Sequence, residues 1–331
     1  MLSYILRRFI YMLIMLAFMS LVAFVIIQLP PGDYLTMYVR QLEATGQPLD
    51  ESEIESLKRQ YGLDQPMYVR YFKWVGGMFH GDFGRSVQWH KSVINLVGER
   101  LILTITISIV TIVFTYIVSI LIGIYSATHQ YSFFDYAFTV VGFVGLATPN
   151  FLLALVLMIL FNNAFGLSIG GLFSPEYSTA GWSLGKVWDM IKHLPVPIIV
   201  VGTAGTAGLI RVMRGMLLDE LRKQYVITAR TKGLSEGKLL YEYPVRVALN
   251  PIISTIGWVL PAIVSGSTIT AMVLSLPTVG PLLFRALMTE DMYLAGTIVM
   301  FLCFLTIVGM FVSDMLLASL DPRIRFEKAK T

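Results

Sequence analysis

The sequence predicts an all-α integral membrane protein with six transmembrane helices and an external helical insert after the first of them. Three observations predict this class: 56% of the 331 residues are hydrophobic, only 14% are charged, and the mean hydropathy is +0.70. A soluble domain carries about 25% charged residues. The composition therefore excludes a water-soluble enzyme, a disordered chain and, despite the net charge of +4, a nucleic-acid-binding protein. The single cysteine excludes an internal disulfide and a cysteine-based metal site.

Stretches without Asp, Glu, Lys or Arg locate the spans, because a charge at the middle of a bilayer costs about 2.5–3.5 kcal/mol. Roughly 20 helical residues cross the hydrocarbon core. Three longer stretches, 101–134, 136–175 and 247–284, each hold one span, because polar or helix-breaking residues end the helix inside them. The expected spans are 9–28, 101–125, 136–162, 195–216, 251–275 and 292–318.

The distribution of basic residues sets the orientation of these spans. With the N-terminus inside, the inside segments carry 14 Lys or Arg, against 3 in the short outside loops. We therefore expect a cell (inner) membrane protein with both termini in the cytoplasm. Arg7 and Arg8 before an apolar run also resemble a secretory signal, but this run exceeds the usual length of about 7–15 residues and no A-x-A-like site follows it. An uncleaved first span is favoured.

The chain divides into four parts: a cytoplasmic N-terminus with the first span (1–28), an external segment (29–100), a core of five spans (101–318) and a cytoplasmic tail (319–331). The core includes a cytoplasmic loop at 217–250. In the external segment, residues 50–59 place acids early and bases late, as the helix dipole favours. This segment is either a solvated helical insert with its own small core or a docking surface for an external partner.

Motifs for catalysis are absent from the sequence. The four histidines show no metal-ligand spacing, and H-E-x-x-H, G-x-S-x-G and a P-loop do not occur. We therefore expect no enzyme activity, no ATP hydrolysis by this chain alone, and no cofactor or metal bound to it. Asp314, the one acid inside a span, is either an interfacial carboxylate paired with an Arg or Lys, or part of a proton or ion relay.

The cytoplasmic loop continues the fourth span as an amphipathic helix. A second short helix is expected around 225–230, with Gly233 able to end it and Ser235 able to cap the next helix. Such a helix is suited to docking into a groove on a soluble partner. Alternatively, it lies at the membrane surface, and its basic residues serve only to keep the loop on the cytoplasmic side. The apolar stripe consists of Met213, Met216, Leu217 and Leu221.

The loop reads Tyr225-Val226-x-Thr228-Ala229-Arg230-x-Lys232-Gly233-Leu234-Ser235. This pattern resembles the EAA-type loop of permease subunits of ABC importers, and the whole chain is similar to the first permease of the dipeptide/oligopeptide/nickel family. Further matching segments are Gly62-Leu63-Asp64-x-Pro66, Gly81-Asp82-Phe83-Gly84-x-Ser86, Ala147-Thr148-Pro149-x-Phe151 and Leu320-Asp321-Pro322-Arg323-x-Arg325.

The resemblance implies a type I ABC importer permease fold and a set of partners. These are a second homologous permease in a heterodimer, two ATP-binding subunits that hold ATP and Mg, and an external solute-binding protein. The imported solute would be an oligopeptide or dipeptide, an oligosaccharide, or nickel. The residues implied in coupling to the ATPase are Tyr225, Thr228, Ala229, Arg230, Lys232, Gly233 and Ser235.

The resemblance also implies a role for several coupling residues. Small side chains at Thr228 and Ala229 would let the partner's backbone approach closely, Arg230 and Lys232 would pair with its acidic groups, and Gly233 would allow the bend.

Polar and small residues of the fifth span are candidates for the translocation path or, alternatively, for close packing between helices. The competing functions are a self-contained secondary transporter or channel, which the scarcity of acids in the spans disfavours, and a membrane scaffold or enzyme without a recognisable site. The candidate path residues are Ser265, Ser267, Thr268 and Thr270.

Overall fold

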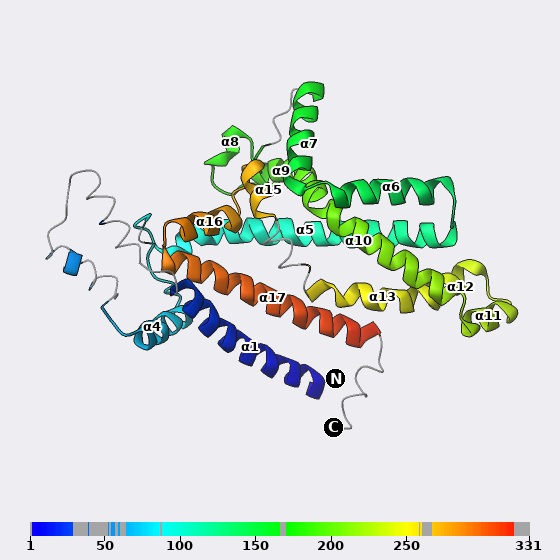
Figure 1. The fold of residues 1–331 in the computed structure, drawn as a ribbon, viewed down its shortest axis with the longest axis horizontal. Helices are drawn as coiled ribbons and strands as arrows, with labels where there is room; N and C mark the ends of the chain where they lie inside the picture. Colours follow the sequence, from blue (N-terminus) through cyan, green and yellow to red (C-terminus); the bar gives the residue numbers. More distant parts are fainter. Residues whose placement is uncertain are drawn as a thin grey trace. The chain divides into compact units, whose positions relative to one another are not determined.

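The structure is a computed structural model whose regular elements are α-helices (Figure 1). Within the described residues, the only β-type pairing is a single antiparallel bridge between Arg85 and Ser92, so the all-α class is confirmed. The structure describes residues 2–28, 39, 52, 54–56, 59, 64–86, 88–165, 170–257, 259 and 267–320.

The chain forms two compact units, which are described separately below. Unit 1 comprises Met1–Phe9, Ile105–Pro277 and Val308–Thr331. Unit 2 comprises Ile10–Thr104 and Thr278–Ile307.

Among the described residues, four helices are long and apolar enough to cross a membrane, and they confirm the predicted first, second, fourth and sixth spans. They are α1 (Leu2–Gln28), α5 (Val93–Thr128), α10 (Pro195–Leu221) and α17 (Met292–Leu320). α5 begins before the predicted start at 101, and α10 extends beyond the predicted end at 216. Charged residues are tolerated in a helix where it leaves the hydrocarbon core, so a search for charge-free runs underestimates helix length.

The predicted third span, 136–162, is not one continuous helix. α6 (Phe133–Ala147) and α7 (Asn150–Phe165) meet at a bend of 108°, so that α7 leaves α6 steeply (Figure 1). Pro149 causes the break, because a proline disfavours the helical conformation of the residue before it. Thr148 accordingly has extended angles (φ −89°, ψ 121°), and its hydroxyl donates to the carbonyl of Val144 at 2.8 Å.

The predicted fifth span, 251–275, lies partly outside the described residues. The structure describes its two flanks as α13 (Pro244–Ser254) and α15 (Thr268–Val273). The described residues therefore contain four spans, or five if the α6–α7 pair crosses the membrane as one. The remaining helices are α4 (Met67–Phe79), α8 (Pro175–Ser178), α9 (Leu184–His193), α11 (Gln224–Thr231), α12 (Glu236–Glu242) and α16 (Val279–Met288).

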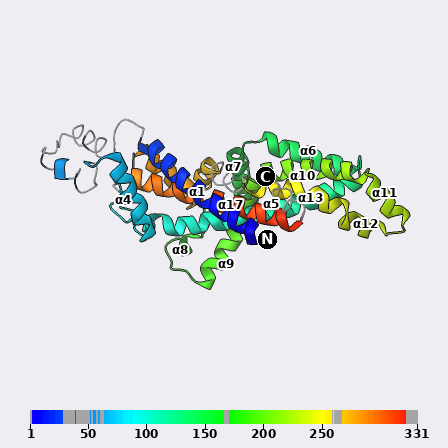
Figure 2. The same ribbon diagram turned by 90° about the horizontal axis from the view of Figure 1, so that it is seen from below.

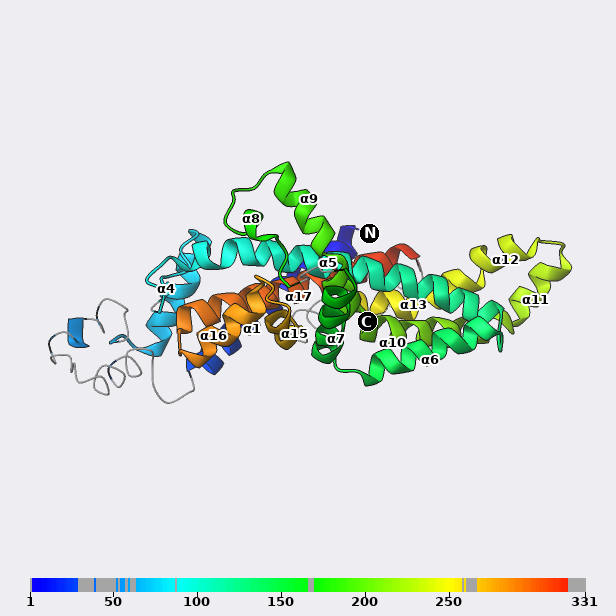
Figure 3. The ribbon, with the colours of Figure 1, turned by 90° about the horizontal axis from the view of Figure 1, so that it is seen from above.

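In unit 1, α10 is the central helix and packs against α6, α7 and α13. Figure 3 shows α6 lying alongside α10. The α5–α10 contact is close because Gly123 has no side chain: a Cβ added there would lie 2.6 Å from Cβ of Met213. Small residues allow such contacts between membrane helices, where van der Waals packing replaces the hydrophobic drive. Met213 and Leu217 are fully buried here, as the amphipathic stripe predicts.

An ion pair joins the first and last helices within unit 1. Arg8 Nη1 lies 2.8 Å from Asp314 Oδ2, and the two side chains are 31% and 27% exposed. This confirms the pairing with a basic residue that the sequence offers as one explanation of Asp314.

Unit 2 contains the described end of segment 29–100, where α4 is helical; the predicted helical run 50–59 lies largely outside the described residues. α4 buries Trp74, whose ring packs on Phe24 at 5.5 Å, and Phe24 packs edge-on against Tyr71 at 5.3 Å. The Tyr71 hydroxyl also shares a hydrogen bond with Ser20 at 2.8 Å. An apolar face of α4 is thereby attached to the unit 2 part of α1.

The segment after α4 is held to the start of α17 by a buried carboxylate. Ser86 Oγ donates to Asp291 Oδ2 at 2.5 Å, and the backbone N–H of Leu294 donates to Asp291 Oδ1 at 3.3 Å. Asp291, which is fully buried, therefore both caps α17 and positions the Gly81–Ser86 segment.

The backbone of this segment approaches Tyr293 closely at Gly84, and replacement of this glycine gives a testable prediction. Its φ is +82°, and an added Cβ would lie 2.9 Å from Cδ1 of Tyr293. Gly84→Ala should lower the free energy of unfolding by about 2–4 kcal/mol, since backbone strain and overpacking add. Gly81→Ala is the matched control: φ is +77°, but nothing lies within 4 Å. Thermal unfolding in detergent should separate the two variants, and equal shifts would contradict the close contact.

Candidate functional site

The predicted coupling loop is an ordered extension of α10. After α10 ends at Leu221, the chain turns at Arg222 and Lys223 and enters α11, and α12 follows and lies beside α11 (Figure 2). Extended angles at Lys223 (φ −76°, ψ 150°) provide the turn into α11. The two short helices therefore follow directly after α10, the central helix of unit 1.

Glu220 fixes the angle between α10 and α11. Its buried carboxylate accepts hydrogen bonds from the Lys223 ammonium and the Tyr225 hydroxyl. Burial, together with the hydrogen bond that the hydroxyl donates to Glu220, raises the pKa of Tyr225, so the phenol stays a donor at neutral pH. Tyr225 thus has a structural role at this joint that its place in the loop motif does not reveal.

A small apolar core joins α11 to α12. Val226, Ala229 and Leu239 are buried together, and Leu234 packs against them. Gly233 ends the first helix with φ +81°, as expected of a glycine after a helix. Ser235 lies at the N-cap position of α12 as predicted, but its side chain makes no capping hydrogen bond.

An ion pair bridges the same turn. Arg230 Nε and Nη2 donate to the two carboxylate oxygens of Glu236 at 2.6 and 3.0 Å. The hydrogen bonds from Arg230 lower the pKa of Glu236, and the same contact raises the pKa of Arg230. Both side chains are exposed, so this ion pair lies on the surface of the turn.

The structure places most of the predicted coupling residues on one exposed helical hairpin. Ala229 differs, because it is buried in the α11–α12 core, where its small side chain lets the two helices approach. The exposed members are Tyr225, Thr228, Arg230, Lys232, Gly233 and Ser235.

The candidate path residues are only partly described. Thr270 is buried in α15, Ser267 and Thr268 are half-buried, and Ser265 lies outside the described residues. α15 packs against α7 within unit 1.

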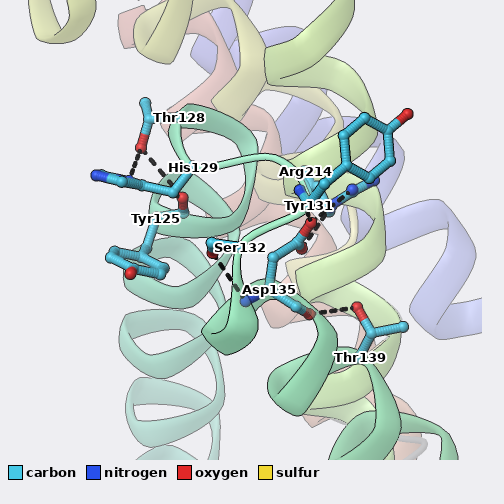
Figure 4. Close-up of polar contacts among 8 residues, drawn as sticks. All are labelled: Tyr125, Thr128, His129, Tyr131, Ser132, Asp135, Thr139 and Arg214. Carbon is cyan, nitrogen blue, oxygen red and sulfur yellow. Dashed lines mark hydrogen bonds and ion pairs between the residues drawn. The ribbon is translucent and has the colours of Figure 1, made fainter.

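A second polar joint was not predicted from the sequence. Asp135 is 2% exposed, and its two carboxylate oxygens accept from Nε and Nη2 of Arg214, each at 2.9 Å (Figure 4). The backbone N–H of Tyr131 donates to the same carboxylate at 3.0 Å, and Ser132 caps α6 by accepting from the Asp135 N–H at 3.2 Å. The start of α6 is thereby attached to α10, seven residues before α10 ends.

The sequence contains one signal that marks Asp135 as unusual. Asp135 is the only charged residue between positions 101 and 175, where it separates two long apolar runs. Arg214 is visible as one of the basic residues after the fourth span. The sequence does not show that a turn brings the two together, and the segment 126–135 was expected only to be a short loop.

Together, the long apolar helices of the described residues define a multi-pass membrane protein, in which a helical hairpin follows the end of α10. Within the described ranges, no three His, Cys, Asp or Glu side chains gather as a metal site requires.

Comparison with known proteins identifies the family. Residues 119–326 match the model of the binding-protein-dependent transport system inner membrane component, and residues 1–110 match the N-terminal model of the same membrane components. The chain belongs to this family of ABC importer permeases.

Curated relatives match along nearly the whole chain. The oligopeptide transport system permease protein AppB of Bacillus subtilis (strain 168) is 33% identical over 328 residues, which cover 98% of this chain and 99% of the relative. The dipeptide transport system permease protein DppB of Alkalihalophilus pseudofirmus is 30% identical, with 98% and 100% covered. The peptidoglycan transport system permease protein YejB of Agrobacterium fabrum is 29% identical, with 98% and 99% covered.

Proposed function

We propose that this chain is the permease subunit of an ATP-driven importer of oligopeptides or dipeptides. The observation that carries the proposal is the match over 98% of the chain to permeases named for oligopeptide and dipeptide transport. Oligosaccharides and nickel are the alternative solutes, and the transport experiment described below distinguishes them from peptides.

The chain would work with a second, homologous permease as a heterodimer, with two ATP-binding subunits that hold ATP and Mg, and with an external binding protein that delivers the solute. Its spans would lie in the inner membrane with both termini in the cytoplasm, where the basic residues concentrate. The segments 29–100 and 217–250 would then lie on opposite sides of the membrane. Ser265, Ser267, Thr268 and Thr270 remain candidates for the path.

The α11–α12 hairpin would be the part that receives force from the ATP-binding subunits. Its exposed residues, Thr228, Lys232 and Ser235 among them, would contact the groove of the ATPase. Arg230 is already bonded to Glu236, which supports a role in holding the turn rather than in pairing with an acid of the partner.

Two joints support transmission from this hairpin into the membrane helices. Glu220 fixes α11 to the end of α10 through Tyr225 and Lys223. The Asp135–Arg214 pair then fixes α10 to the start of α6. When closure of the ATPases moves α11, α10 and the start of α6 would follow together, because packed elements linked by bidentate pairs move as one body.

Transport in proteoliposomes tests the proposal. The chain is reconstituted with its second permease, the ATP-binding subunits and the external binding protein, and uptake of a labelled peptide is measured with and without ATP. We expect uptake that needs ATP and every partner, and that unlabelled peptides compete away but maltooligosaccharides or Ni²⁺ do not. Uptake by this chain without the ATP-binding subunits would overturn the coupling proposal, and competition only by sugar or nickel would overturn the peptide assignment.

A further inference from the structure

A cavity of about 220 Å³ lies between α6 and α10 in unit 1. One part of its wall is apolar and another carries two guanidinium groups. Gly142 widens the cavity on the α6 side, where an added Cβ would lie 3.5 Å from Cβ of Ala207 on α10. The wall includes Phe138, Gly142, Phe143, Ala207, Arg211 and Arg214.

The two arginines of this wall differ in how their charge is balanced. Arg214 is neutralised by the bidentate contact with Asp135. Arg211 instead lies over the ring of Phe143, with its guanidinium carbon 4.9 Å from the ring centroid. Among the residues that the structure describes, no acid forms an ion pair with Arg211. Arg211 is exposed beside the cavity, near the inner end of the predicted fourth span 195–216, so its charge is accessible to an anion from outside the chain.

The surroundings of the cavity indicate what kind of anion would fit. The outer face of α6 beside it is apolar and exposed, with Val140, Val141 and Val144 each 60% or more exposed. Phe143 belongs both to this face and to the cavity wall. A ligand that enters here needs a negative group at one end and an apolar part that continues along α6.

We propose that this cavity binds an anionic phospholipid, with the headgroup phosphate at Arg211 and an acyl chain along Phe138, Gly142 and Phe143. Arginine suits this task, because its planar fork pairs with phosphate oxygens while its face stays on the aromatic ring. Basic pockets between membrane helices recognise lipid headgroups in this manner. The site is independent of the transported solute.

Lipid titration of the full-length chain, purified with its second permease, tests the site by native mass spectrometry and by thermal unfolding. The probes are phosphatidylglycerol, phosphatidylcholine and inorganic phosphate. We expect phosphatidylglycerol to bind and to raise the unfolding temperature more than phosphatidylcholine does. Arg211→Gln should weaken this binding about fivefold, as expected for one basic residue near an anionic headgroup. Gly142→Leu, which keeps the charge but fills the cavity, should weaken it as well.

Two controls decide between a lipid site and simpler explanations. Arg222→Gln removes an exposed basic residue at the end of α10, outside the cavity, and should leave phosphatidylglycerol binding unchanged. Arg211→Lys should retain part of the binding. Equal affinity in wild type and Arg211→Gln overturns the proposal, as does equal protection by inorganic phosphate, which would indicate a simple anion site. Loss of the second permease from Arg211→Gln, with lipid binding unchanged, would assign this face to the partner subunit instead.

Discussion

Replacing Arg214 with methionine should lower the free energy of unfolding by about 3 kcal/mol, the lower end of the cost of breaking a buried ion pair. The loss is large because Asp135, whose side chain is 3% exposed, would keep its charge without its bidentate partner. The lower end applies because the Arg214 side chain is itself 27% exposed, so only one partner of the pair is fully buried. Denaturant titration of the purified chain in mixed micelles measures the change.

Two further variants show whether the lost pair is responsible. In the double variant Arg214→Met, Asp135→Leu, stability should recover relative to Arg214→Met alone, because no charge is left buried. Lys238→Met removes one partner of an exposed pair, with 4.0 Å between Lys238 and Glu242, and should cost less than about 0.5 kcal/mol. If Arg214→Met costs no more than Lys238→Met, the Asp135–Arg214 pair does not hold α6 to α10.

Ala229→Asp should abolish coupled transport while leaving membrane insertion intact. Ala229 is 7% exposed and packs with Val226 and Leu239, so a carboxylate there would be buried without a partner and would separate α11 from α12. In proteoliposomes, ATP-dependent uptake should fall to background. ATP hydrolysis should fall to the rate that the ATP-binding subunits show when no solute is transported. The amount of chain recovered in the membrane should equal that of the wild type.

Gly237→Asp is the matched control for this prediction. It introduces the same side chain on the neighbouring helix, but an added Cβ meets nothing within 4 Å, and an acid near the start of α12 is favourable. Uptake should stay close to that of the wild type. Normal uptake by Ala229→Asp would show that the α11–α12 core plays no part in coupling, whereas a loss in both variants would point to added charge rather than to disrupted packing.

The helices that the sequence predicts correctly are those whose apolar run is uninterrupted. α1, α5, α10 and α17 each contain a long run without charge, and no neighbour is needed to make such a run helical in lipid. The third span shows the limit of this reasoning. Thr148 and Pro149 carry no charge, so a search for charge-free runs passes over them, and the backbone restriction before proline is what predicts the bend.

The candidate site was predictable in position but not in its contacts. The loop motif located α11 and α12, and Gly233 and Ser235 lie at the turn and the helix start where local rules place them. The roles of Ala229 and Tyr225 depend on contacts with Leu239 and Glu220, which spacing along one helix cannot reveal. Asp135 and Arg214 are 79 residues apart, and only the packing of α6 on α10 brings them together.

The pairing of Arg8 with Asp314 has a consequence for how the protein is made. The ribosome adds Arg8 to the chain long before it adds Asp314. The first helix, α1, can therefore form this ion pair only after the part of α17 that carries Asp314 has been made. A product truncated before position 314 lacks that carboxylate, so this ion pair cannot form in it.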